Sequence, residues 1–373
     1  MEQKIITAEN EYRQLDEWLR DNHCKRVFLV CDDSMRFQKA LTAHLDALEK
    51  TGIMLSYFSD FKPNPIYESV VEGVSLFRAQ GCDAIIAVGG GSAMDVAKCV
   101  KLYSNMDGDG VEGGYLKQNI VPNEIPFLAM PTTAGTGSEA TRYAVIYYKG
   151  QKQSITHESC IPGTVLLDPN CLKTLPLYQK KATMMDALCH AIESFWSVNS
   201  TEESRGYSQK AIKLVIDNMD GYLDNTDTGN AQMMMAAHIA GKAINITQTT
   251  AGHAMCYKIT SLFGVAHGHA AILCDRVLFP WMIANVHRCI DRRGEAHLKS
   301  VFDGIADAMC CENPEAAAQM LNDIFDKLEL EVPAASNAQY EELKISVNPV
   351  RLKNHPVLLD ETAIDELYHR ILR

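Results

Sequence analysis

The first half of the chain alternates short apolar runs with stretches of helical spacing. The apolar runs of strand length are 26–31 (RVFLVC), 54–58, 84–88 (AIIAV), 127–130 and 144–148. The stretches whose apolar residues recur every three or four positions are 35–50, 67–80 and 92–103. Alternation of this kind gives a mostly parallel sheet with helices on both faces. The pattern therefore predicts an α/β domain.

The second half of the chain has a different pattern, which is helical throughout. Apolar residues recur at helical spacing in 180–198, 204–219, 231–246, 297–309 and 360–372. The stretch 349–356, which begins and ends with proline, is predicted to be a loop. Pro169 and Pro176 lie where the alternating strand–helix pattern gives way to the helical pattern. We therefore expect an α/β domain over residues 1–173 and an all-helical domain over residues 174–373.

Composition narrows the class of protein. With 373 residues, 47% hydrophobic and 22% charged, the chain has room for two packed domains. A net charge of −12 disfavours nucleic acid as a partner. The twelve cysteines form no C-x-x-C pair, as expected of small buried side chains in a reducing compartment. No apolar run approaches the ~20 residues of a membrane helix. These features predict a cytoplasmic protein without a membrane partner.

A glycine-rich turn follows the strand-like run 84–88. Gly89, Gly90, Gly91 and Ser92 open a helix that carries Asp95. Glycines let a backbone approach a ligand closely, and a helix N-terminus offers unpaired N–H groups to an anion. The turn therefore predicts a pyrophosphate site, although the G-x-G-x-x-G fingerprint is absent. Alone, it also fits a tight strand–helix turn with Ser92 as the N-cap.

Two further features favour a dinucleotide. The segment 131–139 (PTTAGTGSE) follows another strand-like run and offers the hydroxyls of Thr132 and Thr133. Alone, it also fits a flexible surface loop. Asp32 ends the first strand-like run, where a carboxylate can bind a ribose diol and repel a 2′-phosphate. Asp32 therefore favours NAD(H) over NADP(H).

Asp186 and His190 are four positions apart on a predicted helix. On one helix face they lie one turn apart, and a carboxylate and an imidazole can then bind the same cation. The spacing alone also fits an ion pair or a core histidine. His253 and His267 are fourteen positions apart, which in one straight helix would separate them by ~21 Å. A helix stop at Gly264 would let them converge. Three imidazoles and one carboxylate suit divalent iron or zinc.

At this point the chain resembles a known family. The segments GGGSAMDVAK (89–98), PTTAGTGSEAT (131–141), DALCHAIES (186–194) and GHAMCYKITSLFGVAHGHA (252–270) resemble the iron-dependent, or group III, alcohol dehydrogenases. The resemblance covers nearly the whole chain. It implies a dehydroquinate synthase-like architecture, with a dinucleotide-binding domain, a helical domain and one metal between them.

The resemblance also carries roles for individual residues. It implies that Asp186, His190, His253 and His267 bind the metal, Fe²⁺ in preference to Zn²⁺, and that Thr136 and Lys152 lie near the cofactor. A homodimer is the family expectation. Many members have a further histidine four positions after the first histidine of the pair, where this chain has Tyr257. The proton relay or substrate contact assigned to that histidine would then fall to Tyr257 or His269.

A narrower resemblance concerns the substrate. Residues 241–250 (GKAINITQTT) and 140–143 (ATRY) look like the phosphonoacetaldehyde reductase, or 2-hydroxyethylphosphonate dehydrogenase, branch. A phosphonate needs cationic partners, and Arg142 and Lys258 are the nearest candidates in these segments. Both residues also fit ordinary surface positions. The expected reaction is the reduction of a small aldehyde, phosphonoacetaldehyde among the candidates, to its alcohol.

Three alternatives stay open. A lyase of the dehydroquinate synthase type shares the architecture and the metal–NAD site, but it consumes no net NADH. A reductase of a short-chain aldehyde without a phosphonate would use the same machinery. A catalytically silent metal-binding protein would retain metal without binding NADH.

Overall fold

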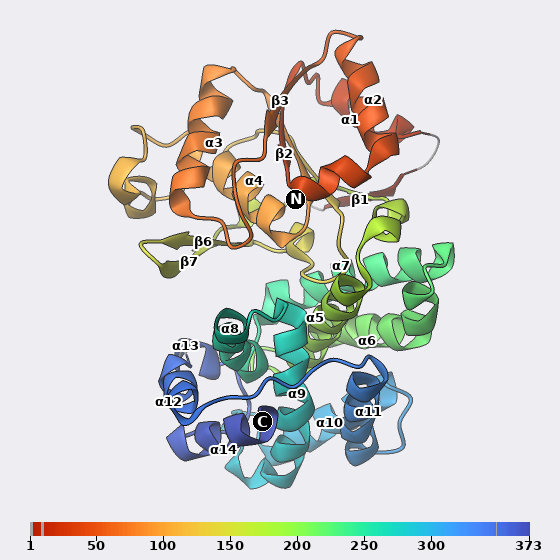
Figure 1. Ribbon diagram of the computed structural model, residues 1–373, viewed down its shortest axis with the longest axis vertical. Helices are drawn as coiled ribbons and strands as arrows, with labels where there is room; N and C mark the ends of the chain where they lie inside the picture. Colours follow the sequence, from red (N-terminus) through yellow and green to blue (C-terminus); the bar gives the residue numbers. More distant parts are fainter. Residues whose placement is uncertain (1–2, 9–10, 348) are drawn as a thin grey trace. The chain divides into compact units, whose positions relative to one another are not determined.

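The computed structural model describes residues 3–8, 11–347 and 349–373 (Figure 1). The chain divides into two compact units. The first comprises Met1–Thr133 and Ser138–Thr174, and the second comprises Ala134–Gly137 and Leu175–Arg373. None of the helices in the described ranges has the length and apolar character needed to cross a membrane.

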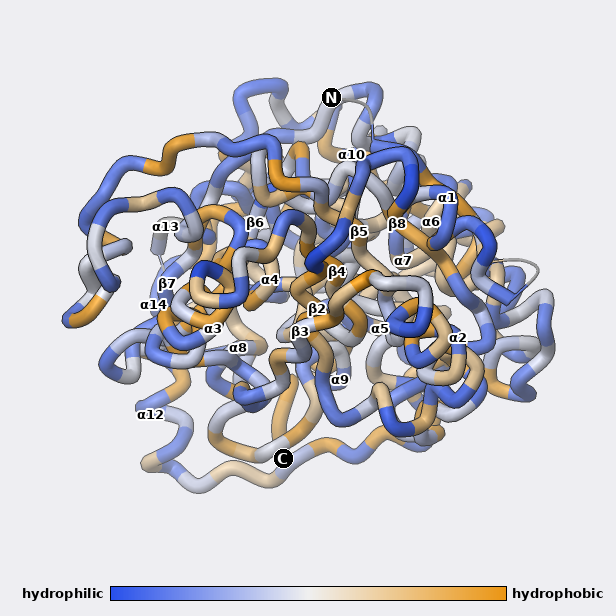
Figure 2. The backbone as a smooth tube through the Cα atoms, turned by 90° about the horizontal axis from the view of Figure 1, so that it is seen from above, coloured by the Kyte–Doolittle hydropathy of each residue, from blue (hydrophilic) through white to orange (hydrophobic). Residues whose placement is uncertain are grey.

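A six-stranded sheet forms the centre of the first unit, and every strand pair in it is parallel. Its strands are β1 (Lys4–Thr7), β2 (Arg26–Cys31), β3 (Met54–Phe58), β4 (Ala84–Gly89), β5 (Phe127–Pro131) and β8 (Thr164–Leu167). The strand order is β1-β8-β5-β4-β2-β3. Strands β2 and β4 are apolar along most of their length, as Figure 2 shows, because both faces of a parallel sheet are covered. The predicted α/β architecture is confirmed.

The predicted strand at 144–148 lies outside this sheet. It forms β6 (Tyr143–Tyr148), which pairs antiparallel with β7 (Gln151–Thr156) in a separate hairpin. Lys149 and Gly150 connect the two strands with φ angles of 51° and 73°. Positive φ at both central residues is what a tight two-residue hairpin turn requires.

Helices cover both faces of the sheet (Figure 1). The helices of this unit are α1 (Arg13–Asp21), α2 (Lys39–Glu49), α3 (Tyr67–Ala79) and α4 (Gly91–Tyr103). Apolar side chains of α1 and α2 pack on one face, and those of α3 and α4 pack on the other. The predicted helix at 35–50 is divided, because the Asp32 side chain caps a separate 3₁₀ turn, η1 (Asp33–Phe37), ahead of α2.

The order of the strands creates a switch point between β2 and β4. From β2 the chain first moves outward to β3, then returns across β2 to β4 and continues to β5 on the other side. In open α/β sheets, ligands bind at the carboxyl ends of the strands where the order reverses. Asp32 follows β2, and Gly90 and Gly91 follow β4. Both predicted cofactor features therefore lie at the switch point.

The second unit is helical. Its helices are α5 (Leu177–Trp196), α6 (Glu202–Leu223), α7 (Asp227–Thr247), α8 (Ala251–Phe263), α9 (His267–Ala284), α10 (Glu295–Ala308), α11 (Pro314–Lys327), α12 (Asn337–Ser346), α13 (Pro349–Leu352) and α14 (Glu361–Ile371). Helix α5 packs against α6, α7 and α9, and its residues from Met184 to Trp196 are buried. The stretch 349–356, predicted to be a loop, begins with the short helix α13, because a proline fits the first turn of a helix.

Candidate metal centre and dinucleotide site

One stripe of helix α5 carries three side chains that can hold or orient a cation. Asp186, His190 and Glu193 follow one another at intervals of four and three positions, which keeps them on one face. Their exposed fractions are 2%, 6% and 0%. Buried carboxylates and imidazoles need partners, so this stripe requires polar groups from the neighbouring helices.

The turn between α8 and α9 supplies those groups. Helix α8 ends at Phe263, and Gly264 follows it in the left-handed region with φ of 68°. The predicted helix stop at Gly264 is confirmed. His253 lies in the first turn of α8 and His267 is the first residue of α9. The reversal brings the rings of His253 and His267 to a centroid separation of 5.3 Å.

The side chains from the three helices converge. Ligand atoms of Asp186, His253 and His267 all lie within 4.8 Å of one another. Asp186 Oδ1 is 3.4 Å from His253 Nε2 and 3.9 Å from His190 Nε2. The His190 and His253 rings stack at 4.4 Å. Two atoms that each lie ~2.0–2.2 Å from one cation are ~3.3–3.6 Å apart in a tetrahedral site, and Asp186 Oδ1 and His253 Nε2 have this separation. The donor set fits a divalent metal.

Two glycines let the helices approach. A Cβ at Gly268 would lie 2.0 Å from the Ala182 carbonyl oxygen and 2.6 Å from Asp186 Cβ. A Cβ at Gly252 would lie 1.8 Å from Asp275 Oδ1 and 2.7 Å from Glu193 Oε1. Neither position has room for a side chain. The glycines next to His253 and His267 therefore set the spacing of α5, α8 and α9.

Glu193 lies behind His253 and was not predicted from the sequence. Its Oε1 accepts from the His253 backbone N–H at 2.9 Å and pairs with His253 Nδ1. Its Oε2 accepts from the Thr250 hydroxyl at 2.6 Å and from the Thr250 backbone N–H. A carboxylate on the far nitrogen of a ligating histidine fixes the ring and raises its basicity. The sequence does contain a signal for Glu193: it is seven positions after Asp186, which places both side chains on the same face of α5.

The pKa shifts suit cation binding. Burial alone would raise the pKa of Asp186, but the neighbouring His190, His253 and His267 hold it well below its usual range. Burial lowers the pKa of His190, which keeps this imidazole neutral. Burial opposes a charge on His253, yet Glu193 and Asp186 together raise the pKa of His253 to about 10. The two carboxylates that hold a proton on His253 favour a positive charge at this position.

Of the two predicted proton donors, one contacts this cluster. The Tyr257 ring stacks on the His267 ring at 5.1 Å with an interplanar angle of 27°. His269 is 2% exposed, and both of its nitrogens have partners. Its Nδ1 is 3.0 Å from the Tyr178 hydroxyl, and its Nε2 is 2.9 Å from the Glu331 carbonyl oxygen. These bonds indicate a structural role for His269.

The two predicted substrate cations have carboxylate partners. Lys258 Nζ forms an ion pair with Glu342. Arg142, which belongs to the first unit, lies 2.7 Å from Glu158 Oε1. Each positive charge is therefore balanced by an acidic neighbour.

The glycine turn at the end of β4 is built around Asp32. Gly89 has φ of 151°, and a Cβ there would lie 2.6 Å from Asp32 Oδ2. Asp32 Oδ2 accepts from the Gly90 N–H at 3.2 Å, and Oδ1 accepts from the Ser34 N–H at 2.9 Å. The carboxylate thus links the ends of β2 and β4. Ser92 follows Gly91 in the first turn of α4, and its Oγ lies 3.4 Å from the Asn64 backbone nitrogen.

The hydroxyl-rich segment after β5 is divided between the two units. Thr132 and Thr133 belong to the first unit, and the Thr132 hydroxyl lies 3.2 Å from the Ser34 hydroxyl. Thr136 belongs to the second unit, as do Gly135 and Gly137. A Cβ at Gly135 would lie 2.8 Å from Thr183 Cβ, and one at Gly137 would lie 2.6 Å from the Ala237 carbonyl oxygen. These glycines serve close packing against α5 and α7, which a freely mobile loop would not need.

Asp95 is held inside the first unit. Its carboxylate accepts from the Ser138 hydroxyl at 3.0 Å and from the Val145 N–H at 3.1 Å. Burial raises the pKa of Asp95 to about 6. Lys98 donates to the carbonyl oxygens of Ser138 and Tyr143 at 2.6 and 2.7 Å. Lys152 is in β7, where its charge acts on Asp95. These residues connect α4 to the hairpin.

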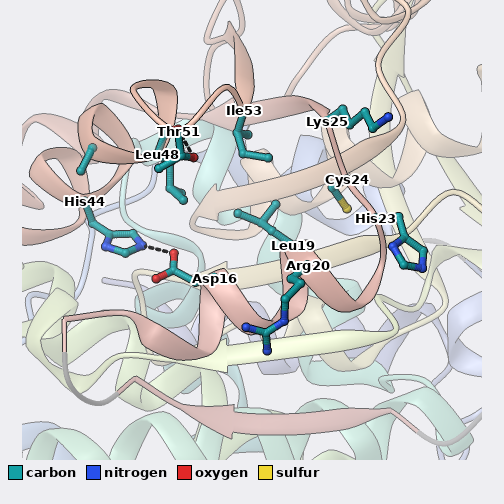
Figure 3. A pocket seen from close by; sticks show the side chains of 11 residues that line it. Asp16, Leu19, Arg20, His23, Cys24, Lys25, His44, Leu48, Thr51 and Ile53 are labelled. Carbon is teal, nitrogen blue, oxygen red and sulfur yellow. Dashed lines mark hydrogen bonds and ion pairs between the residues drawn. The ribbon is translucent and has the colours of Figure 1, made fainter.

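A separate pocket of about 490 Å³ lies in the first unit (Figure 3). Lys25 and Ile53, which line it, precede β2 and β3. It therefore lies at the amino ends of these strands, at the opposite edge of the sheet from the glycine turn. Its polar lining includes His44 Nε2, 2.8 Å from Asp16 Oδ1. The pocket does not coincide with the predicted cofactor site.

Comparison with known families defines the class. The profile of iron-containing alcohol dehydrogenases matches residues 2–169, and the profile of the C-terminal domain of Fe-containing alcohol dehydrogenases matches residues 180–370. The chain belongs to the iron-containing alcohol dehydrogenase family.

Individual relatives cover several substrates. A phosphonoacetaldehyde reductase of Streptomyces viridochromogenes is 32% identical over 252 residues, which are 64% of this chain and 63% of that protein. This chain therefore matches less than two thirds of that relative's length. The 1,3-propanediol dehydrogenase of Klebsiella pneumoniae is 31% identical over 275 residues, 72% of this chain and 70% of that protein.

The solved structures agree on the fold. The sulfoacetaldehyde reductase of Bifidobacterium kashiwanohense, in complex with NAD⁺, superposes with a TM-score of 0.88 at 24% identity. That match covers 99% of this chain and 96% of the other. A 1,3-propanediol oxidoreductase superposes with a TM-score of 0.86, also at 24% identity, over 99% of this chain and 98% of the other.

Proposed function

We propose that this protein is a metal-dependent, NAD(H)-linked alcohol dehydrogenase that reduces a small aldehyde to its alcohol. The convergence of Asp186, His253 and His267 within 4.8 Å, with Glu193 behind His253, carries the proposal. His190 completes the donor set from the same helix as Asp186. The metal is Fe²⁺ in preference to Zn²⁺, supported by the family to which the chain belongs.

The cofactor site is proposed at the switch point of the sheet. Gly89, Gly90, Gly91 and Ser92 would receive the pyrophosphate at the N-terminus of α4, with Thr132, Thr133 and Lys152 of the same unit as further cofactor residues. The family resemblance also assigns Thr136 to the cofactor. Asp32 would receive the ribose and disfavour NADP(H). Asp95 would act from behind this site by holding the hairpin on α4. A sulfoacetaldehyde reductase of the same fold was solved in complex with NAD⁺, which supports NAD(H) as the cofactor.

The chain's own residues would orient the reactants and supply the proton. When bound, a divalent metal polarises a carbonyl group, and the nicotinamide carries the hydride. Asp186, His190, His253 and His267 would hold the cation, and the burial of the α5 stripe would limit the access of water to it. Burial raises the pKa of the Tyr257 phenol, so Tyr257 would stay protonated and able to donate. His269, bonded at both nitrogens, is the weaker candidate for the donor.

We propose phosphonoacetaldehyde as the aldehyde. The support is the phosphonoacetaldehyde reductase of Streptomyces viridochromogenes, which is 32% identical to this chain over 252 residues. We also propose a cytoplasmic homodimer. Twelve cysteines without a disulfide support a reducing compartment, and the dimer is the family expectation.

The proposal is tested by NADH oxidation in anaerobic buffer with Fe²⁺ and a panel of phosphonoacetaldehyde, glyceraldehyde, lactaldehyde and butanal. We expect net NADH consumption, loss of turnover on chelation, and loss of turnover in a folded His267→Ala variant. Full activity of that variant after chelation and dialysis would refute the metal site. A preference for the aldehydes without a phosphonate would refute the substrate.

A further inference from the structure

Arg351 of α13 lies against the helix turn that carries His253. Helix α13 packs on α8, and Arg351 Nη1 donates to the Thr249 hydroxyl at 3.0 Å, just before α8 begins. The Arg351 guanidinium carbon is 4.8 Å from the centroid of the Tyr257 ring. Helical side chains lean toward the N-terminus, so the Tyr257 ring covers the turn of His253. The guanidinium therefore lies beside the first turn of α8.

The same tyrosine connects Arg351 to the cluster of ligands. One ring contact joins Tyr257 to His267 at 5.1 Å, and one joins Tyr257 to the guanidinium at 4.8 Å. The guanidinium carbon and the His267 ring are therefore separated by no more than the sum of these two distances. A two-carbon aldehyde separates its carbonyl oxygen from the phosphorus or sulfur atom of its head group by three bonds, of which the C=O and C–C bonds are about 1.5 Å or shorter. An extended substrate and a moderate side-chain movement can span this separation.

Arg351 differs from the other cations considered for this role. Within the described ranges 3–8, 11–347 and 349–373, Arg351 contacts the Thr249 hydroxyl and the Tyr257 ring, and no carboxylate forms an ion pair with it. Lys258 and Arg142 are paired with Glu342 and Glu158. Arg351 is half-buried, so solvent screens its charge only partly. A guanidinium has five N–H donors, and one bond to a hydroxyl leaves several for a planar or tetrahedral anion.

We propose that Arg351 binds the anionic end of the substrate, with the Tyr257 ring as the platform between this end and the aldehyde at the metal ligands. The substrate class is a short aldehyde that carries a phosphonate or sulfonate group. The inference rests on the proposed aldehyde reductase function and adds the residue that selects for charge. It also gives a reason for an aromatic side chain at position 257, because guanidinium groups stack favourably on aromatic faces.

The test compares phosphonoacetaldehyde with butanal in the Fe²⁺-loaded protein. For Arg351→Gln we expect kcat/KM for phosphonoacetaldehyde to fall on the order of 100-fold, mainly through KM, because a charge-assisted bidentate contact is lost. The value for butanal should change by less than about threefold. Arg351→Lys should recover part of the loss. Unchanged selectivity in Arg351→Gln, or an equal loss for both aldehydes, would overturn the inference.

A matched control is Arg288→Gln. Arg288 also lies over an aromatic ring, at 5.5 Å from Trp281, but it forms an ion pair with Asp360. This variant should keep the wild-type preference for phosphonoacetaldehyde, and a comparable loss there would overturn the specific role of Arg351.

A binding measurement separates this inference from the proposed function. Phosphonoacetate is titrated calorimetrically into the metal-loaded wild type and into Arg351→Gln. If the wild type reduces no aldehyde, the proposed function fails, and this titration still decides the role of Arg351. Binding that is lost in Arg351→Gln supports the anion site, and binding that is absent in the wild type or equal in both proteins overturns it.

Discussion

Glu193 uses one carboxylate to fix both the start of α8 and the orientation of His253. It accepts from the backbone N–H groups of Thr250 and His253, from the Thr250 hydroxyl and from the His253 ring. Because His253 Nδ1 faces Glu193, Nε2 faces Asp186. The ring orientation that a metal ligand needs is therefore set before any cation binds.

Replacing Glu193 with Gln should weaken metal binding. The amide keeps the shape of the side chain but loses the charge that makes His253 basic, so we expect metal affinity to fall about 10- to 100-fold. Competition with a chelating dye for Co²⁺ or Zn²⁺ measures this change. Glu342→Gln, which removes the exposed partner of Lys258, serves as the control and should bind as the wild type does. Wild-type affinity in a correctly folded Glu193→Gln protein would exclude this positioning role.

Asp95 should make stability depend on pH in a defined window. Burial raises its pKa from 3.8 to about 6, so the folded protein retains a proton that the unfolded chain releases. The neutral carboxyl is fully favourable below pH 3.8, and this contribution is lost as the pH rises toward 6. Relative to Asp95→Asn, the wild type should therefore lose up to ~3 kcal/mol of unfolding free energy across this window.

Urea unfolding of the metal-free wild type and Asp95→Asn at several pH values measures that difference. The difference between the two proteins should level off above about pH 7, where Asp95 is ionised in both states. A difference that is independent of pH between 4 and 7 would contradict the raised pKa of Asp95.

For single residues, the sequence predicts which side chains belong to the site better than it predicts which residues they contact. Asp186 and His190 follow from helical spacing, and the turn at Gly264 follows from the need for His253 and His267 to converge. Arg351 and Tyr257 are far apart in the chain, so no local sequence pattern predicts their contact. The helix after the glycine turn carries Asp95, which makes it a candidate cofactor residue, but no local pattern predicts that its carboxylate accepts from Ser138 and Val145.

The spacing of α5, α8 and α9 depends on glycines rather than on large apolar side chains. Gly268 faces the backbone of α5 and Gly252 faces the carboxyl groups of Glu193 and Asp275. Because both glycines neighbour a histidine of the cluster, any separation of the helices would also move a metal ligand.

Gly268→Ala should therefore lower both stability and metal affinity. The added methyl group would meet the Ala182 carbonyl oxygen at 2.0 Å, and backbone atoms cannot rotate away as a side chain can. Overpacking of this kind costs ~1–3 kcal/mol or more. Gly206→Ala is the matched control, because Gly206 lies inside α6 with nothing within 4 Å of the added atom.

Thermal unfolding with and without Zn²⁺ measures both effects. Gly206→Ala should be neutral or more stable by ~0.5–1 kcal/mol, since alanine favours a helix. If Gly268→Ala behaved like Gly206→Ala and kept its metal affinity, the close approach of α9 to α5 would be wrong.

Elements were predictable where they were long or strongly apolar. The buried strands β2 and β4 and the long helices of the second unit follow from their patterns. The strands β1 and β8, with four residues each, are too short to give a period. The sequence pattern does not predict the pairing of β6 with β7, because an apolar run of strand length does not indicate which strand it pairs with. Lys149 and Gly150 are nevertheless suitable residues for a two-residue hairpin turn.

At the scale of the whole molecule, the order of the strands places the cofactor features together. Asp32 and the glycine turn are far apart in the chain, and only the reversal of strand order between β2 and β4 makes them neighbours. Strand order depends on pairings between distant segments, so the sequence could predict a parallel sheet but not this order. The family resemblance implied a dinucleotide-binding domain but not the order of its strands.

Asp32→Asn should shift the preference between cofactors. The amide removes the charge that repels a 2′-phosphate, so we expect the ratio of NADPH to NADH affinity to rise about 10- to 100-fold. Fluorescence titration with each nucleotide measures the ratio. Asp33→Asn is the control, because Asp33 is exposed in η1 and should leave the ratio unchanged. An unchanged ratio in Asp32→Asn would contradict the ribose-binding role.

A crystal of the wild-type protein soaked anaerobically with Co²⁺ tests the metal centre most directly. The anomalous map of the second unit should contain one strong peak within ~2.0–2.2 Å of ligand atoms of Asp186, His253 and His267, with His190 as the fourth ligand. The peak should be absent from crystals of His267→Ala prepared in the same way. A peak at any other place, or an empty cluster in the wild type, would contradict the metal site on which the proposed chemistry depends.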